Sequence, residues 1–205
     1  MNDRQSGNIF IVSAASGTGK TTLVSRLVSR NGDIRVSVSH TTRPPRAGEA
    51  EGVHYYFVSA DKFADMIGQG AFLEHAQVFG NFYGTSLAEV RRLSEQGFDV
   101  VLEIDVQGAA QVRQSLPEAV SIFILPPSMA ELENRLRSRK TDSDEVITRR
   151  LGEAEEEIRQ AFAFDYVVSN HDLDQAEADL LHIIRAARLR QPRQSRAIEK
   201  VLQNT

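Results

Sequence analysis

The sequence predicts an α/β fold in which a parallel β-sheet is flanked by helices on both faces. Near the start, an apolar, β-branched run leads through a loop of small residues into Gly-Lys-Thr-Thr at the head of a helix (residues 9–22). After it, short apolar runs alternate with longer segments of helical periodicity. This alternation is typical of parallel sheets with helical crossovers, whose ligands bind beyond the carboxyl ends of the strands.

The first half of the chain is rich in predicted strands. Periodicity and end signals predict helix 22–30, strand 35–39, strand 54–58, helix 61–68 and strand 72–78. An Asn-Gly pair ends the first helix, and Ser59 is placed to cap the second. Two consecutive prolines at 44–45 exclude a helix there and favour an extended segment. We expect residues 79–85 to form a tight aromatic turn.

The second half continues the alternation of strands and helices. The same signals predict helix 86–97, strand 99–106, helix 107–114, strand 120–125, helix 128–139, helix 144–162, strand 166–168 and helix 173–190. Ser-x-x-Glu capping boxes open the helices at 86 and 128, and consecutive prolines stop the strand before 126. Past Pro192 the tail is polar and mixed in charge, and we expect it to be mobile.

Composition bounds the function classes. The chain has 205 residues, of which 41% are hydrophobic, and a net charge of -4. Mild acidity argues against general binding of nucleic acid, which relies on a basic surface. Without cysteine there are no disulfides and no thiolate metal sites. A polar start and a short apolar run predict neither a signal peptide nor a membrane span, so we expect a cytoplasmic protein without a membrane partner, and self-association stays open.

The loop near the start has the pattern of a phosphate-binding (Walker A) loop, with Ala14 in place of the first glycine. Its backbone N–H groups and the following helix N-terminus can surround an anion. Lys20 would place its charge on the β- and γ-phosphates, and Thr21 its hydroxyl on Mg²⁺. The candidate ATP-binding residues are Ala14, Ala15, Ser16, Gly17, Thr18, Gly19, Lys20, Thr21 and Thr22. The alternative is an ordinary strand–turn–helix corner with a surface lysine.

A second anion-binding candidate lies on the proline-stiffened segment. Arg43 and Arg46 are three residues apart there, and a guanidinium group matches phosphate oxygens bidentately. The alternative is a solvated basic turn.

Beyond these two features, the sequence resembles the guanylate kinases. The resemblance is carried by residues 39–49 (SHTTRPPRAGE), 52–57 (GVHYYF), 82–85 (FYGT), 103–108 (EIDVQG) and an arginine-rich stretch at 135–150, and it extends from about 9 to about 184. It implies a P-loop kinase core (1–38, 86–126 and 161–205), a strand-rich GMP-binding insertion (39–85) and a helical ATP lid (127–160). It also implies Mg-dependent transfer of the ATP γ-phosphoryl group to GMP, giving GDP and ADP.

The resemblance implies how GMP is held. The phosphate would be gripped by Arg43, Arg46, Tyr55 and Tyr83, and the base would be read by Glu74 with Ser39 and Thr85. One carboxylate can accept both N1–H and N2–H₂ of guanine, which adenine cannot offer. As alternatives, the tyrosines are core aromatics and Glu74 is an outward-facing strand carboxylate.

Two acids follow the strand expected beside the P-loop strand, where an acid near Mg²⁺ belongs in such kinases. Relatives usually have aspartate at the position of Glu103. Because the glutamate side chain is longer, two roles stay open for it: contact with the water ligands of the metal, or contact with the ribose and base of GMP. Asp105 is the stronger candidate for the GMP side. The alternative is a pair of charges that cap the next helix.

In the lid, the resemblance assigns arginines to the phosphates. Arg139 and Arg150, with Lys20 and Arg43, are the candidate catalytic residues, while Arg135 and Asn170 are candidate ATP contacts. His171 replaces an aspartate of the family pattern beside Asn170. A solvated helical hairpin is the alternative for the arginines.

Two rival functions share parts of these patterns. A kinase resembling ribose 1,5-bisphosphate phosphokinase has the loop and the lid but does not need Glu74 or the Arg43 and Arg46 pair. A non-catalytic module resembling the guanylate-kinase-like domains of scaffold proteins would have a degraded loop, and only Ala14 favours that interpretation.

Overall fold

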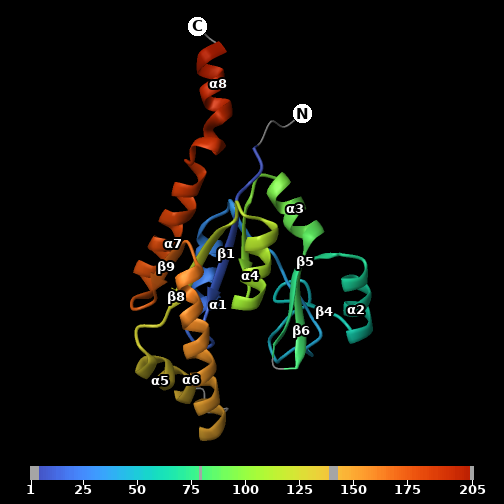
Figure 1. Ribbon diagram of the computed structural model, residues 1–205, viewed down its shortest axis with the longest axis vertical. Helices are drawn as coiled ribbons and strands as arrows, with labels where there is room; N and C mark the ends of the chain where they lie inside the picture. The colour runs from blue at the N-terminus through green and yellow to red at the C-terminus, as the bar shows by residue number, and fades with distance from the viewer. Residues whose placement is uncertain (1–4, 79, 139–142, 204–205) are drawn as a thin grey trace.

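A parallel sheet forms the centre of the molecule (Figure 1). The computed structural model describes residues 5–78, 80–138 and 143–203. Within them, five strands are ordered β2-β7-β1-β8-β9. They are β1 (Ile9–Ala14), β2 (Ile34–Val36), β7 (Asp99–Glu103), β8 (Val120–Leu125) and β9 (Tyr166–Ser169). All neighbours in this sheet run parallel, which confirms the predicted fold class.

Helices cover both faces of this sheet. Helices α1 (Lys20–Arg30) and α7 (Leu173–Arg188) pack on one face, against fully buried Phe10 and Val12 of β1. Helices α3 (Leu87–Glu95) and α4 (Val106–Ser115) pack on the other, against Ile11. Successive side chains of a strand point to opposite faces, so β1 anchors both layers and its carboxyl end is rigidly held.

A second sheet lies beside the core, with strand order β4-β3-β6-β5 (Figure 1). Its strands are β3 (His40–Thr41), β4 (Tyr56–Phe57), β5 (Phe72–Val78) and β6 (Asn81–Ser86), and helix α2 (Ala60–Gly68) lies between β4 and β5 in the sequence. Phe63 of α2 stacks on Phe72 and Phe82, with ring centroids 4.5 and 5.6 Å apart. These aromatic rings form a small core that holds α2 on this sheet.

The prediction of an aromatic turn at 79–85 is wrong for most of that segment. Residues Asn81–Ser86 form β6, which pairs antiparallel with β5. The chain reverses at Gly80, whose φ of 79° suits glycine, while residue 79 lies outside the described part. Glycine at 84 looked like a turn signal, but it makes room for the rings of Phe72 and Phe63.

Two further helices pack together at the carboxyl end of the core sheet. Helices α5 (Met129–Ser138) and α6 (Asp144–Arg159) share a cluster of Leu132, Leu136, Ile147 and Ala154, and the short helix η1 (Gln160–Ala163) leads back to the core. Ala15 of the loop after β1 belongs to the same cluster. The helical pair is therefore packed directly onto that loop.

The segment after Pro192, predicted as a polar and mobile tail without helix, contains helical structure. The turn η2 (Gln191–Gln194) leads into α8 (Ser195–Gln203), which projects beyond the end of α7 (Figure 1). Ile198, Val201 and Leu202 are exposed on α8. Their spacing of three and four residues is helical, although the surrounding charges obscure it in the sequence. Among the described helices, none has the length and apolarity to cross a membrane.

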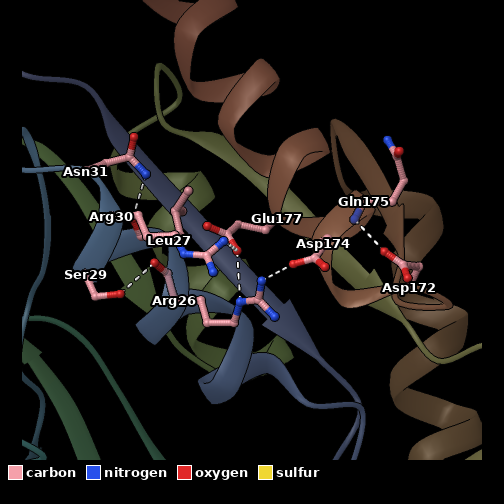
Figure 2. Close-up of polar contacts among 9 residues, drawn as sticks. All are labelled: Arg26, Leu27, Ser29, Arg30, Asn31, Asp172, Asp174, Gln175 and Glu177. Atoms are coloured by element: carbon pink, nitrogen blue, oxygen red, sulfur yellow. Dashed lines mark hydrogen bonds and ion pairs between the residues drawn. The ribbon is translucent and has the colours of Figure 1, made fainter.

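An ion-pair network ties α1 to α7 on the outside of the core (Figure 2). Glu177 of α7 is 7% exposed and accepts from Arg26 and Arg30, each at 2.9 Å. Arg26 also pairs with the exposed Asp174. One buried carboxylate thus holds two cations of the helix that begins at the phosphate-binding loop.

Replacing Glu177 with alanine is expected to lower the free energy of unfolding by about 2 kcal/mol, because two arginines lose their buried partner but still reach water. Urea titration measures this change. Asp174→Ala removes an exposed partner of the same Arg26 and serves as the control, with little expected effect. Equal losses in the two variants would contradict the special weight given to the buried carboxylate.

Candidate active site

The loop between β1 and α1 is shaped to surround an anion. Gly17 and Gly19 have φ of 91° and 99°, a region that side chains disfavour. Ala14 is the last residue of β1 and pairs with Ile124 of β8, so its extended backbone does not require the glycine of the usual pattern. The loop ends at Gly19, which precedes the first turn of α1. Its N–H groups and the helix N-terminus together favour bound phosphate.

Lys20 and Thr21 at the start of α1 meet the end of β7. The Lys20 Nζ atom donates to the carbonyl of Ile104 at 2.9 Å, and the Thr21 hydroxyl donates to the Glu103 carboxylate. Burial lowers the pKa of Lys20, while the negative charge of Glu103 opposes that shift. A cation and two oxygen ligands therefore stand where the predicted phosphates and metal would bind.

Side chains from α5, from α6 and from the segment after β9 bind the phosphate-binding loop directly. The carbonyl of Thr18 accepts from Arg135 of α5 at 3.0 Å and from Asn170 at 2.8 Å. Arg150 of α6 donates to the Ser16 hydroxyl at 2.9 Å. Arg135 and Asn170 were predicted to contact ATP. In the structure they support the loop backbone, and Asn170 is buried after β9.

Glu157 is a residue of this site that the sequence did not reveal. Its carboxylate accepts from the backbone N–H of Ser16 at 3.1 Å, and burial raises its pKa. It lies on α6 among neighbouring glutamates at 153, 155 and 156, all of which fit a solvated helix face. Only the docking of α6 on the loop distinguishes it from them.

Glu74 of β5 carries the carboxylate predicted to read guanine. It is 4% exposed, and its Oε1 atom accepts from the Thr85 hydroxyl of β6 at 2.5 Å. Burial raises the pKa of Glu74 to about 7, the nearby charge of Asp105 adds to the shift, and the Thr85 hydrogen bond opposes it. The alternative of an outward-facing carboxylate is wrong.

This raised pKa links Glu74 to stability. A group with a higher pKa in the folded state favours folding at low pH, and that contribution is lost as pH rises from 4.5 through about 7. We therefore expect Glu74→Gln to be more stable than the original protein above neutral pH, by up to about 3 kcal/mol, and to lose this advantage near pH 4.5. Urea titrations at about pH 5 and about pH 8 test this, and an equal difference at both would contradict it.

Asp105 has a structural role beside its predicted one. It is the N-cap of α4, and its Oδ1 atom accepts from the N–H of Gly108 at 2.8 Å. Its carboxylate also lines the cavity described below. The strand predicted over 99–106 ends earlier, at Glu103, because this cap begins a helix at Val106.

Arg43 is held away from the cavity. Its Nη2 atom donates to both carboxylate oxygens of Glu49, at 2.8 and 2.9 Å, and its Nη1 to the carbonyl of Pro44 at 2.8 Å. The backbone N–H of Arg46 donates to the same carboxylate at 2.8 Å. Glu49 thus occupies the guanidinium face of Arg43 that the sequence analysis assigned to phosphate.

These elements enclose a cavity of about 390 Å³, a size usual for small-molecule sites. The predicted residues that line it are Ala14, Ala15, Ser16, Gly17, Thr18, Gly19, Lys20, Thr21, Thr22, Ser39, Arg46, Tyr55, Glu74, Tyr83, Glu103, Asp105 and Arg150. Glu157 lines it as well. A second hollow of about 500 Å³, between residues 5–6 and 192–196, lies away from the carboxyl ends of the strands.

Four predicted residues do not line the cavity: Arg43, Thr85, Arg135 and Asn170. Thr85 is fully buried behind Glu74, so it reaches the cavity only through that carboxylate. Arg139 lies outside the described residues. Tyr55 and Tyr83 contact one another at the wall, with ring centroids 5.9 Å apart, and the Arg43 guanidinium lies 5.4 Å from the Tyr55 ring.

Comparison with known proteins covers nearly the whole chain. The family model for guanylate kinase matches residues 6–187. The chain is 62% identical over 205 residues to the guanylate kinase of Neisseria gonorrhoeae, with 100% of both chains covered. It is 48% identical over 197 residues to that of Legionella pneumophila, covering 96% of this chain and 94% of the relative. The crystal structure of guanylate kinase from Anaplasma phagocytophilum matches with a TM-score of 0.78 at 36% identity, covering 93% and 90%.

These matches extend far beyond the phosphate-binding loop, which many unrelated proteins share, and they include the segment 39–85, which carries Glu74. The resemblance inferred from the sequence motifs is confirmed. The chain belongs to the guanylate kinase family.

Proposed function

We propose that this protein transfers the γ-phosphoryl group of ATP to the phosphate of GMP and releases ADP and GDP. One observation carries the proposal. The phosphate-binding loop with Lys20 and the buried carboxylate of Glu74 face the same cavity of about 390 Å³. The proposed site for the ATP phosphates and the carboxylate proposed to recognise guanine thus line the same cavity.

The reaction needs charge neutralisation more than proton transfer. A phosphate oxygen of GMP forms a bond to the γ-phosphorus as the bond from that phosphorus to ADP breaks. The attacking phosphate has a second pKa of about 6, so it is already an anion near neutral pH. Each pair of unit charges about 4 Å apart costs roughly 4 kcal/mol at an effective dielectric of 20. We assign their neutralisation to Lys20, Arg46, Arg139 and Arg150, and to Arg43 once its guanidinium exchanges the Glu49 carboxylate for the GMP phosphate.

Mg²⁺ fits the residues at the end of β7. Among the described residues, no cluster of three His, Asp or Glu side chains could hold a metal alone. Mg²⁺ in kinases is bound by one or two oxygen ligands, water and substrate phosphates, and the Thr21 hydroxyl and Glu103 carboxylate are hard oxygen ligands in contact. Thr21 would hold the ion and Glu103 would bind one of its waters. When bound, the ion shields phosphate charge.

Guanine selection is assigned to the Glu74 end of the cavity. The ionised carboxylate can accept N1–H and N2–H₂ of guanine, while AMP would leave it buried without those donors. Ser39, Tyr55, Tyr83 and Asp105 complete the proposed GMP side, with Thr85 acting through Glu74.

The direct test is ADP production from MgATP with GMP, AMP, UMP or ribose 1,5-bisphosphate as acceptor, beside a blank without acceptor. We expect turnover with GMP alone. Turnover with only the sugar phosphate would keep the loop assignment and reject that of Glu74. GMP binding without turnover on any acceptor would instead favour a non-catalytic module.

A further inference from the structure

Gly108 is the part of the 103–108 motif for which the proposed chemistry gives no reason. It lies in the first turn of α4 and is not among the glycines with positive φ, so its backbone does not require glycine. Glycine within a helix costs roughly 0.5–1 kcal/mol relative to alanine. A reason for it must come from what lies against the helix.

The space beside Gly108 is filled by the Glu74 carboxylate. A Cβ atom at position 108 would lie 2.5 Å from Oε2 and 3.0 Å from Cδ of Glu74, and 3.4 Å from Oδ1 of Asp105. Real Cβ atoms essentially never approach another heavy atom to 2.5 Å. Any side chain at 108 therefore displaces the carboxylate of Glu74.

Neither side of this contact can move freely. The Oε1 atom of Glu74 is fixed by the Thr85 hydroxyl at 2.5 Å. Helix α4 is fixed to β5 by Gln111, whose side-chain amide donates to the carbonyl of His75 at 2.8 Å and accepts from its N–H at 3.1 Å. Because His75 follows Glu74 directly, this pair sets the distance between the carboxylate and the helix.

We propose that Gly108 is a positioning residue for guanine selection, leaving open the space in which the Glu74 carboxylate is aimed at the base. This rests on the proposed function, in which Glu74 reads guanine. With a methyl group at 108, Glu74 must tilt away from α4 and loses its alignment with N1–H and N2–H₂. Lys20 and the phosphate-binding loop are held by hydrogen bonds that do not involve Glu74, so we expect the contacts to the reacting phosphates to be kept.

Gly108→Ala tests this by separating KM from kcat. We expect KM for GMP to rise about 10- to 100-fold, with kcat at saturating GMP and KM for ATP within about twofold of the original values. The preference for GMP over IMP, which lacks the N2 amino group, should fall with it. Because alanine favours the helix, the melting temperature should not fall by more than a few degrees.

The control is Gly68→Ala at the end of α2, a helical glycine with no heavy atom within 4 Å of its added Cβ. We expect its kinetics to match the original protein. A rise in KM for GMP in Gly68→Ala as large as in Gly108→Ala would overturn the proposal, because a generic effect of alanine would then explain both.

A double-mutant cycle distinguishes the proposed role of Gly108 from a general loss of stability in the variant. In the Glu74→Ala background there is no carboxylate to displace, so adding Gly108→Ala should change kcat/KM for GMP by less than about twofold. Additive losses would overturn the proposal, as would an unchanged KM in Gly108→Ala alone. If the original protein phosphorylates GMP and Glu74→Ala is impaired, such a result rejects only the role of Gly108. Absence of GMP turnover in the original protein rejects the proposed function and this inference together.

Discussion

Replacing Lys20 with alanine is expected to reduce kcat by about 10²- to 10³-fold or more, while GMP binding changes little. The Nζ atom is fixed at 2.9 Å from the Ile104 carbonyl, so the cation is already in place before the nucleotide arrives. No other described cation comes from the phosphate-binding loop itself. Steady-state kinetics with varied MgATP and GMP measure the effect.

The fold of the Lys20→Ala variant should be intact. Burial lowers the pKa of Lys20, while its acidic neighbours, Glu103 first, oppose that shift. Because the two effects partly cancel, we expect the melting temperature to change by only a few degrees. Lys62→Ala on the exposed face of α2 makes the same change of charge and should keep full activity. A Lys20→Ala variant with turnover within about fivefold of the original would reject the loop as the phosphate site.

The sequence predicted the core well because local signals and tertiary packing agree there. Small residues, Gly-Lys-Thr and an apolar strand predict the loop and β1 without any long-range information. In the second sheet, local signals and tertiary packing disagree. The Phe-Tyr-Gly-Thr run has turn-like composition, yet pairing with β5 and packing against Phe63 make it a strand. Short strands are decided by their partners, which the local sequence does not contain.

The sequence was sufficient to predict most of the residues that line the cavity, but not which neighbours their side chains contact. The sequence identifies Arg43 as a phosphate ligand from its stiff segment, but the choice between phosphate and Glu49 depends on how the loop closes. Thr85 is a hydroxyl near the base in the motif, and only the sheet register places it behind Glu74. Glu157 is one glutamate among several until α6 docks. In each case the contact that determines the role of the residue is made with a partner that is distant in the sequence or that no local sequence signal identifies.

Replacing Glu74 with alanine is expected to lower kcat/KM for GMP by about 10²- to 10³-fold, because two hydrogen bonds to one charged acceptor are lost. Activity with AMP should change far less, since AMP never uses that acceptor, and the ratio of GMP to AMP activity should fall accordingly. The measurement is kcat/KM for both acceptors at saturating MgATP, with KM for ATP expected to stay within about twofold.

Two comparisons separate base reading from a general loss of structure. Glu74→Gln keeps one acceptor oxygen but offers an amide donor to guanine, so its kcat/KM for GMP should also fall although its stability at high pH increases. Glu118→Ala removes an exposed glutamate outside the site and should leave both acceptors unaffected. Loss of activity together with gain of stability in Glu74→Gln would indicate that the protein tolerates a destabilising buried charge because guanine requires an ionised acceptor. Parallel loss of GMP and AMP activity in Glu74→Ala would instead show that Glu74 supports the fold and does not select the base.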